Sequence, residues 1–288
     1  MRKWVDKFLS EMADKNEKIR LIIADVGDFP LFFKKHSNKF FNVGVSESNA
    51  IGIAAGLASE GYIVYVYGVS SFFLYRAYEQ FKYSISYWKQ RVTFIGVGFG
   101  WKYFNIGIGH FCPDDILLVQ SFPYFEIYTP YNLLQLSEML KYHCSGPKYI
   151  RLTANILEEP IDKEFTCSKE YMLVTYGEMV KSCINVIRKL HNIGLTNVGL
   201  IPLQSLNEKE IKSVLCEYEN SNLFIVEDQC ANGGLYPLLR EMNVNIRIHI
   251  NLPLLPDKIA ESRHKLLESY RLDENSIFHI IKKVLEDE

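Results

Sequence analysis

Glu47 is the one acidic side chain in the stretch FFNVGVSESNAIGIAAGL, residues 40–57. Ser46 and Glu47 are residue types that begin helices, because serine caps free backbone N–H groups and glutamate favours the positive end of the helix dipole. The helix that follows is apolar, and Gly52 and Gly56 leave one face slim, so it can pack closely on two sides. A structural role at the helix start is the simpler alternative. We nevertheless expect Glu47 to be poorly solvated and able to hold a proton near neutral pH, as acid–base chemistry requires.

The elements that position this carboxylate follow an alternating pattern. Short runs rich in β-branched and aromatic residues alternate with longer segments whose apolar residues have helical spacing, which is typical of an α/β fold. Nearly continuous apolar strands indicate a mostly parallel sheet covered by helices on both faces. The predicted strands span 21–25, 40–43, 63–69, 92–98, 126–130 and 148–153, and the predicted helices span about 47–60, 72–88, 113–121 and 131–144.

The alternation stops after residue 153 and then restarts. The intervening stretch is polar, contains Pro160 and has no clear periodicity, so we predict a linker there. The pattern therefore predicts a first domain at 1–153, a linker at 154–169 and a second, smaller α/β domain at 170–288. In the second domain, the predicted strands span 171–177, 198–204, 222–228 and 246–250.

Composition narrows the class of protein. With 288 residues, 48% of them hydrophobic, and a net charge of -2, the chain can bury large cores and has no excess positive charge to attract nucleic acid. No run approaches the ~20 apolar residues of a membrane span, and the charged N-terminus does not resemble a signal peptide. Six cysteines include no CxxC pair, so we expect no metal site of that kind. These features predict a cytoplasmic protein that binds neither nucleic acid nor membranes.

Several segments, in order and spacing, resemble the transketolase family of thiamine-diphosphate enzymes. The resemblance covers nearly the whole chain and implies a pyrimidine-binding domain followed by a transketolase C-terminal-like domain. The segments that carry it are FFNVGVSESNAIGIAAGLASEGY, SSFFLYRAYEQF, GHFCPDDILLVQSFPYFEIYTPYN, GPKYIRL, VTYGEMV and IVEDQCANGGLYPLL.

The resemblance implies roles for residues around the cofactor. Glu47 corresponds to the glutamate that hydrogen-bonds ring nitrogen N1′ of the cofactor's aminopyrimidine and so activates thiamine diphosphate. Phe73 corresponds to the aromatic residue that stacks on this ring; the neighbouring Phe72 can take its place, and a core phenylalanine is the alternative. Asp25 corresponds to an acidic residue lining the thiazolium pocket, although carboxylates at strand ends also cap loops.

Other positions correspond to substrate-binding residues. His110, in GIGHF, matches a histidine that contacts the substrate carbonyl or hydroxyl, and a histidine in a glycine-containing loop suits a site better than a core. Arg151, in YIRL, matches an arginine that binds an acceptor's phosphate, and a salt bridge at the domain junction is the alternative. Ile106 departs from the family, which usually has an acidic residue there to contact the donor's hydroxyl. The departure implies that the side of the pocket that binds the donor is more apolar than in the family.

A second departure concerns the diphosphate and Mg²⁺. The family holds both through a GDG motif followed by an asparagine, and no such motif occurs in this sequence. We therefore expect a partner subunit of the transketolase N-terminal type to supply that half of the site. The expected assembly is a heterotetramer of two copies each (α2β2), with self-association through the pyrimidine-binding domain.

The implied reaction is transfer of a two-carbon ketol or acyl unit, with a sugar derivative as the expected substrate. Two alternatives remain. One is the β subunit of a 2-oxoacid dehydrogenase or acyl-transferring enzyme, and the other is a non-catalytic scaffold partner of an active homologue.

Overall fold

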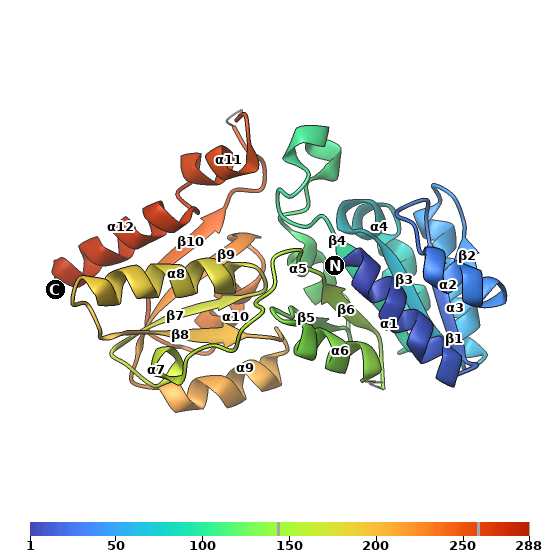
Figure 1. Cartoon of the computed structure of the whole chain (residues 1–288), viewed down its shortest axis with the longest axis horizontal. Helices are drawn as coiled ribbons and strands as arrows, with labels where there is room; N and C mark the ends of the chain where they lie inside the picture. Colours follow the sequence, from blue (N-terminus) through green and yellow to red (C-terminus); the bar gives the residue numbers. More distant parts are fainter. Residues whose placement is uncertain (143–144, 258–259, 288) are drawn as a thin grey trace.

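The computed structural model describes residues 1–142, 145–257 and 260–287, which form two α/β units lying side by side (Figure 1). The first unit contains the N-terminus and is drawn from blue to green; the second contains the C-terminus and is drawn from yellow to red. Each unit has one parallel sheet covered by helices. The predicted α/β fold with two mostly parallel sheets is therefore confirmed.

The first sheet has six strands in the order β2-β1-β3-β4-β6-β5. Its strands are apolar almost throughout because both faces are covered: alternate side chains pack toward α1 and α6 on one face and toward α3, α4 and α5 on the other. The strands are β1 (Ile19–Ile23), β2 (Phe40–Asn42), β3 (Ile63–Val69), β4 (Val92–Val97), β5 (Glu126–Tyr128) and β6 (Lys148–Arg151). The helices are α1 (Arg2–Lys15), α2 (Pro30–Lys35), α3 (Glu47–Ser59), α4 (Ser70–Arg76), α5 (Asp115–Gln120) and α6 (Leu133–Lys141).

The second sheet has four strands in the order β10-β9-β7-β8. One face packs on α8 and α12, and the other packs on α9 and α10. The strands are β7 (Tyr171–Tyr176), β8 (Val198–Leu203), β9 (Asn222–Cys230) and β10 (Ile246–Leu252). The helices are α7 (Lys163–Thr166), α8 (Met179–Asn192), α9 (Glu208–Leu215), α10 (Leu235–Glu241), α11 (Arg263–Ser269) and α12 (Glu274–Glu286).

The helix predicted at 72–88 is interrupted. Helix α4 ends at Arg76, Ala77 leaves helical geometry (φ -109°, ψ 22°), and a wider π-helical turn follows at Gln80–Ser86. Phe81 in this turn packs on Phe94 in the core, with ring centroids 5.2 Å apart. The predicted end of the 131–144 helix, at residues 143 and 144, lies outside the described residues.

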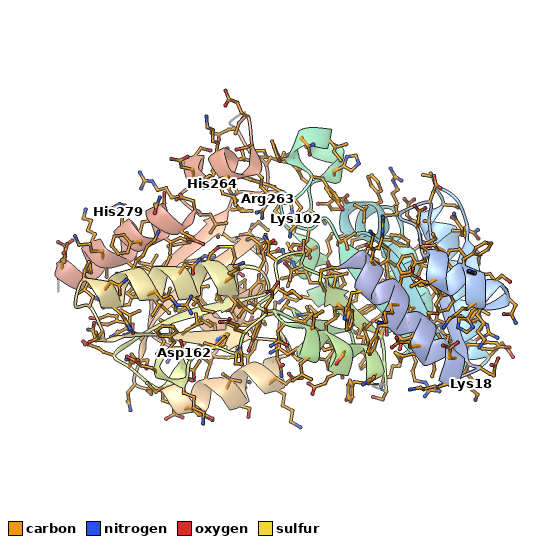
Figure 2. The ribbon with its side chains drawn as sticks, viewed as in Figure 1. Lys18, Lys102, Asp162, Arg263, His264 and His279 are labelled. Carbon is orange, nitrogen blue, oxygen red and sulfur yellow. The ribbon has the colours of Figure 1, made fainter. Side chains whose placement is uncertain are left out.

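The two units share backbone contacts as well as a core. The backbone N–H of Thr129, just after β5, donates to Gln204 O at 2.8 Å, and Leu206 N donates to Ile127 O at 2.9 Å. Side chains of both units also meet at the boundary, where Lys102 of the first unit and Arg263 of the second, both labelled in Figure 2, pair with the same carboxylate, that of Glu178. One apolar cluster contains residues of both sheets. Backbone hydrogen bonds, ion pairs and apolar packing therefore all join the two units.

Within the described ranges, no helix combines the length and the apolar character that crossing a membrane requires.

Candidate active site

The candidate site lies at the carboxyl ends of the first sheet's strands, the edge where parallel α/β sheets bind ligands. Three connections contribute to it. The loop after β2 leads to Glu47 at the first turn of α3, β3 leads directly into α4, and the loop after β4 carries His110.

Glu47 is buried, with 3% of its surface exposed, as the sequence predicts. Its two carboxylate oxygens accept hydrogen bonds from Nη1 of Arg76, at 3.0 and 3.1 Å. The Arg76 side chain is 50% exposed, and its guanidinium lies over the ring of Phe72, 4.4 Å from the centroid. Arg76 thus gives the buried carboxyl group of Glu47 a cationic partner at the edge of the site.

The two neighbouring phenylalanines have different environments. Phe73 is fully buried; its ring packs on Phe94, with centroids 5.2 Å apart, and against Gly68 so closely that an added Cβ there would lie 2.1 Å from it. Phe72 is half-buried, and its ring meets that of His110 edge-on, with centroids 4.8 Å apart. Phe72 presents its ring beside Arg76 and His110, whereas Phe73 lies in the core; which of the two rings stacks on the cofactor stays a prediction.

His110 belongs to a loop whose tip is exposed. Its ring contacts Phe72 and lies 6.3 Å from the ring of Tyr103. Ile106 and Ile108 on the same loop are 57% and 63% exposed. The structure thus brings Glu47, Arg76, Phe72 and His110 together, with an apolar loop tip beside them.

Asp25 lies at the end of β1 and is exposed. Its backbone is left-handed (φ 51°), a conformation that aspartate tolerates better than most residues, and its N–H donates to Asn42 Oδ1 at 3.1 Å. Asn42 Oδ1 also accepts from the N–H of Gly44, at 3.1 Å. These contacts make Asp25 part of a tight connection between strand ends.

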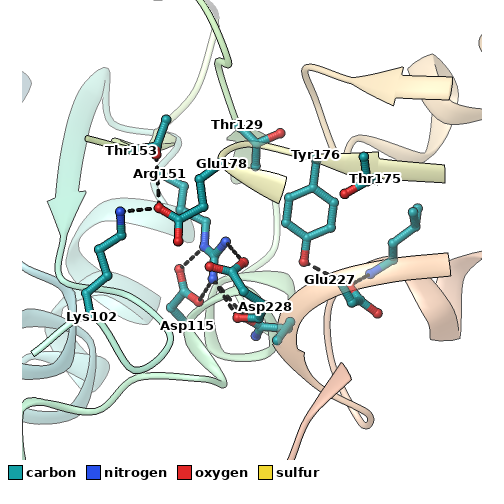
Figure 3. Close-up of polar contacts among 12 residues, drawn as sticks. Lys102, Asp115, Thr129, Arg151, Thr153, Thr175, Tyr176, Glu178, Glu227 and Asp228 are labelled. Carbon is teal, nitrogen blue, oxygen red and sulfur yellow. Dashed lines mark hydrogen bonds and ion pairs between the residues drawn. The ribbon is translucent and has the colours of Figure 1, made fainter. Parts of the chain in front are cut away.

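Arg151 requires the clearest correction. It is only 1% exposed, and its guanidinium donates to Asp115 Oδ2 at 2.9 Å and to Asp228 Oδ1 at 2.6 Å (Figure 3). Burial lowers the pKa of Arg151, but the charges of Asp115 and Asp228 outweigh burial and raise it well above its usual range. The phosphate-binding role inferred from the resemblance does not fit this enclosed guanidinium; the salt bridge at the domain junction does.

The sequence analysis did not predict two features of this region. Arg76 is four residues after Phe72 on α4, a spacing that places both on one helix face and could have been recognised. The ion pair of Lys102 with Glu178 joins residues far apart in the sequence, and no local pattern marks it. In the part of the chain that the structure describes, no group of three His, Cys, Asp or Glu side chains could hold a metal ion.

Residues 1–159 match the family model described as "Transketolase, pyrimidine binding domain". The chain belongs to this transketolase family. A relative from Phocaeicola vulgatus, a subunit of an apulose-4-phosphate transketolase, is 25% identical over 96% of this chain and 94% of its own length. A second, the "Putative transketolase C-terminal section" of Methanocaldococcus jannaschii, is 27% identical over 100% of this chain and 96% of its own.

A solved structure described as "Split gene transketolase, inactive beta4 tetramer" has the same transketolase fold. Its TM-score is 0.81 at 23% identity, and the match covers 99% of this chain and 98% of that one. The likeness therefore includes both α/β units.

Proposed function

We propose that this chain is the pyrimidine-binding subunit of a split, thiamine-diphosphate-dependent transketolase-type enzyme that transfers a two-carbon ketol or acyl unit. The observation that carries the proposal is a buried carboxylate, Glu47, at the start of a helix and close to the half-exposed ring of Phe72. An enclosed carboxyl group and an aromatic face are what recognition of an aminopyrimidine requires.

Arg76 provides a fit test for that ring. Its guanidinium is planar, donates N–H groups to Glu47 and lies on the face of Phe72. An aminopyrimidine is likewise planar, bears nitrogens on its edge and presents a π face. The carboxyl group and the aromatic face that contact the guanidinium therefore suit the cofactor's ring.

In this proposal, thiamine diphosphate supplies the electron sink for carbon–carbon bond cleavage. Glu47 holds a proton at the ring nitrogen N1′, Phe72 supports the ring face, and Phe73 fixes α4 in the core. His110, in contact with Phe72, lies where it can hydrogen-bond a substrate carbonyl or hydroxyl. Asp25 is proposed to line the thiazolium side of the cofactor pocket, with closure of the connection between strand ends as its alternative role.

The substrate proposed is a sugar derivative, and the name of the Phocaeicola vulgatus relative supports a phosphorylated sugar. The exposed Ile106 favours the acyl alternative on the donor side, because an apolar side chain cannot pair a donor hydroxyl. Pyruvate and a ketose phosphate, offered as competing donors, distinguish acyl from ketol transfer.

The diphosphate and Mg²⁺ are proposed to bind mainly to a partner subunit. Mg²⁺ needs oxygen ligands in near-octahedral geometry, and the family's GDG motif is absent from these 288 residues. One relative is named as a transketolase subunit and the structural neighbour as a split-gene transketolase, and both names support a two-chain enzyme. We expect an α2β2 assembly in which unlike chains close each site.

The decisive experiment compares Glu47→Gln with Glu60→Gln, a control at the exposed C-terminal end of the same helix. In the complex reconstituted with the partner, thiamine diphosphate and Mg²⁺, Glu47→Gln should lower turnover by roughly 10²–10⁴, the range of lost acid–base assistance. Glu60→Gln should leave it unchanged. Unaltered turnover in a folded Glu47→Gln complex would refute the cofactor assignment and favour the scaffold alternative.

Calorimetry tests the split site separately. Thiamine diphosphate with Mg²⁺ should bind tightly to the co-purified pair and weakly to this chain alone. Tight binding and full turnover by the isolated 288-residue chain would contradict the proposed partner.

A further inference from the structure

The loop that carries His110 is closed at its base. Gly100 N donates to Cys112 O at 2.8 Å, and Cys112 N donates to Gly100 O at 2.9 Å, so residues 101–111 leave and return at one point. The tip around Ile106 is exposed. The position of His110 therefore depends on what holds the base.

The base rests on the junction between the two units. The ring of Phe99 lies under the guanidinium of Arg151, 3.8 Å from ring centroid to Cζ. Gly100 is left-handed (φ +58°), and a Cβ added there would lie 3.1 Å from the carbonyl oxygen of Asp228 on β9. These contacts leave little freedom where the loop begins.

Trp101 anchors the next position. Its side chain is fully buried, and its ring meets Tyr270, at the end of α11, edge-on with centroids 4.8 Å apart. The ring of Phe111, at the far end of the loop, lies 6.3 Å from that of Trp101. The second unit thus supplies one wall of the pocket that holds the loop's indole.

Lys102 completes the attachment through an ion pair with Glu178 (Figure 3). Glu178 precedes α8 of the second unit, is nearly buried, and also pairs with Arg263 and accepts from Thr153 Oγ1 at 3.2 Å. Burial raises the pKa of Glu178, but the charges of Arg263 and Lys102 outweigh burial and bring it below its ordinary value of 4.5. Glu178 is therefore a fixed negative charge at neutral pH.

We propose that Glu178 is a positioning residue: by holding Lys102, it fixes the loop that presents His110 to the substrate. The inference rests on the proposed function only for the role of His110. Short helical turns connect Lys102 to His110. In these turns, Ile106 N donates to Tyr103 O and His110 N donates to Gly107 O, both at 3.0 Å. A displacement of Lys102 is thereby passed along a hydrogen-bonded segment to the imidazole. The second unit would thus act on the reaction without contacting the substrate.

Hydrogen exchange of the full chain tests this inference without catalysis. Glu178→Gln should make the amides of 101–111 exchange roughly tenfold faster, because local opening of the loop becomes more populated. The matched control is Glu274→Gln, a carboxylate that lines the same cavity of about 420 Å³ but pairs with Asn185 instead of the loop. The control should leave exchange of the loop unchanged.

Lys102→Met provides a second variant, in which Glu178 keeps Arg263 as a partner. It should speed exchange of the loop amides by a similar factor. Combining it with Glu178→Gln should add little, because both substitutions remove the same ion pair, that between Lys102 and Glu178. Loop exchange that is unchanged in the single variants, or equally fast in Glu274→Gln, would overturn the positioning role.

Kinetics of the reconstituted enzyme separate this inference from the proposed function. Glu178→Gln should raise KM for the donor several-fold more than it lowers kcat. Faster loop exchange with both constants unchanged would support the attachment by Glu178 and refute the role of His110 in substrate binding.

Discussion

Arg76 donates to both carboxylate oxygens of Glu47, at 3.0 and 3.1 Å, from a side chain that is itself half exposed. The pair joins the start of α3 to the end of α4 and gives the buried carboxylate a partner. Removing the guanidinium would leave the buried Glu47 side chain without its ionic partner. A glutamine at position 47 carries no charge and would not need that partner.

The first prediction follows from that pair. Arg76→Met should destabilise the chain by about 1–3 kcal/mol, the usual penalty for leaving a buried polar group unpaired. Adding Glu47→Gln should restore most of the loss, because the buried charge is gone. Chemical denaturation of the two single variants and the double variant measures both effects. Equal stability of Arg76→Met and the wild type would contradict the prediction.

The second prediction separates the two phenylalanines of α4. Phe73→Ala should reduce stability by about 3–5 kcal/mol, because it leaves a cavity against Phe94 and Gly68. Phe72→Ala should cost about 1 kcal/mol but weaken binding of thiamine diphosphate to the assembled enzyme. Denaturation and calorimetry on the same pair of variants decide the matter; the reverse assignment predicts that Phe73→Ala is the one that mainly affects the cofactor.

The third prediction concerns Arg151. Arg151→Met should destabilise the protein by about 3–5 kcal/mol, because Asp115 and Asp228 would remain buried without their cation. Arg188→Met serves as a control, since that arginine lies on the outer helix α8. A stable Arg151→Met protein with only a raised KM for a phosphorylated acceptor would instead support phosphate binding.

The fourth prediction is a pH dependence. The pKa of Glu178 is lower in the folded protein than its ordinary value of 4.5, since Arg263 and Lys102 outweigh the effect of burial. Glu178 therefore stabilises the fold fully above about pH 4.5, and this contribution disappears as the pH falls through its folded pKa. Denaturation of wild type and Glu178→Gln should give a stability difference at pH 7 that shrinks progressively as the pH falls below 4.5. A difference that is constant with pH would exclude this linkage.

The sequence predicted the fold better than the site, for physical reasons. Apolar strands alternating with amphipathic segments form a local signal, and every strand predicted in the first unit is present. Phe72 and Phe73 are adjacent on one helix, so their types alone did not show which ring faces the sheet. The partners of Arg151 include Asp228, which lies 77 positions away along the chain, and no spacing rule reveals such a contact.

The break at Ala77 was missed for a similar reason. Residues 72–88 keep helical spacing, but packing of Phe81 on Phe94 is achieved by a wider turn. Glu47 was recognised because burial follows from the apolar helix behind it, whereas its pairing with Arg76 depends on the tertiary arrangement of α3 and α4.

The contact between β5 and residues 204–207 has a consequence for biosynthesis. The outer edge of β5 is paired by a segment that follows β8, so the first sheet keeps an exposed edge until that segment has been synthesised. Translation at roughly 5–20 residues per second leaves that edge uncovered for several seconds. A nascent chain stalled or truncated between β6 and β8 would therefore offer a strand edge to other chains, and chaperones that bind such edges should engage it during this interval.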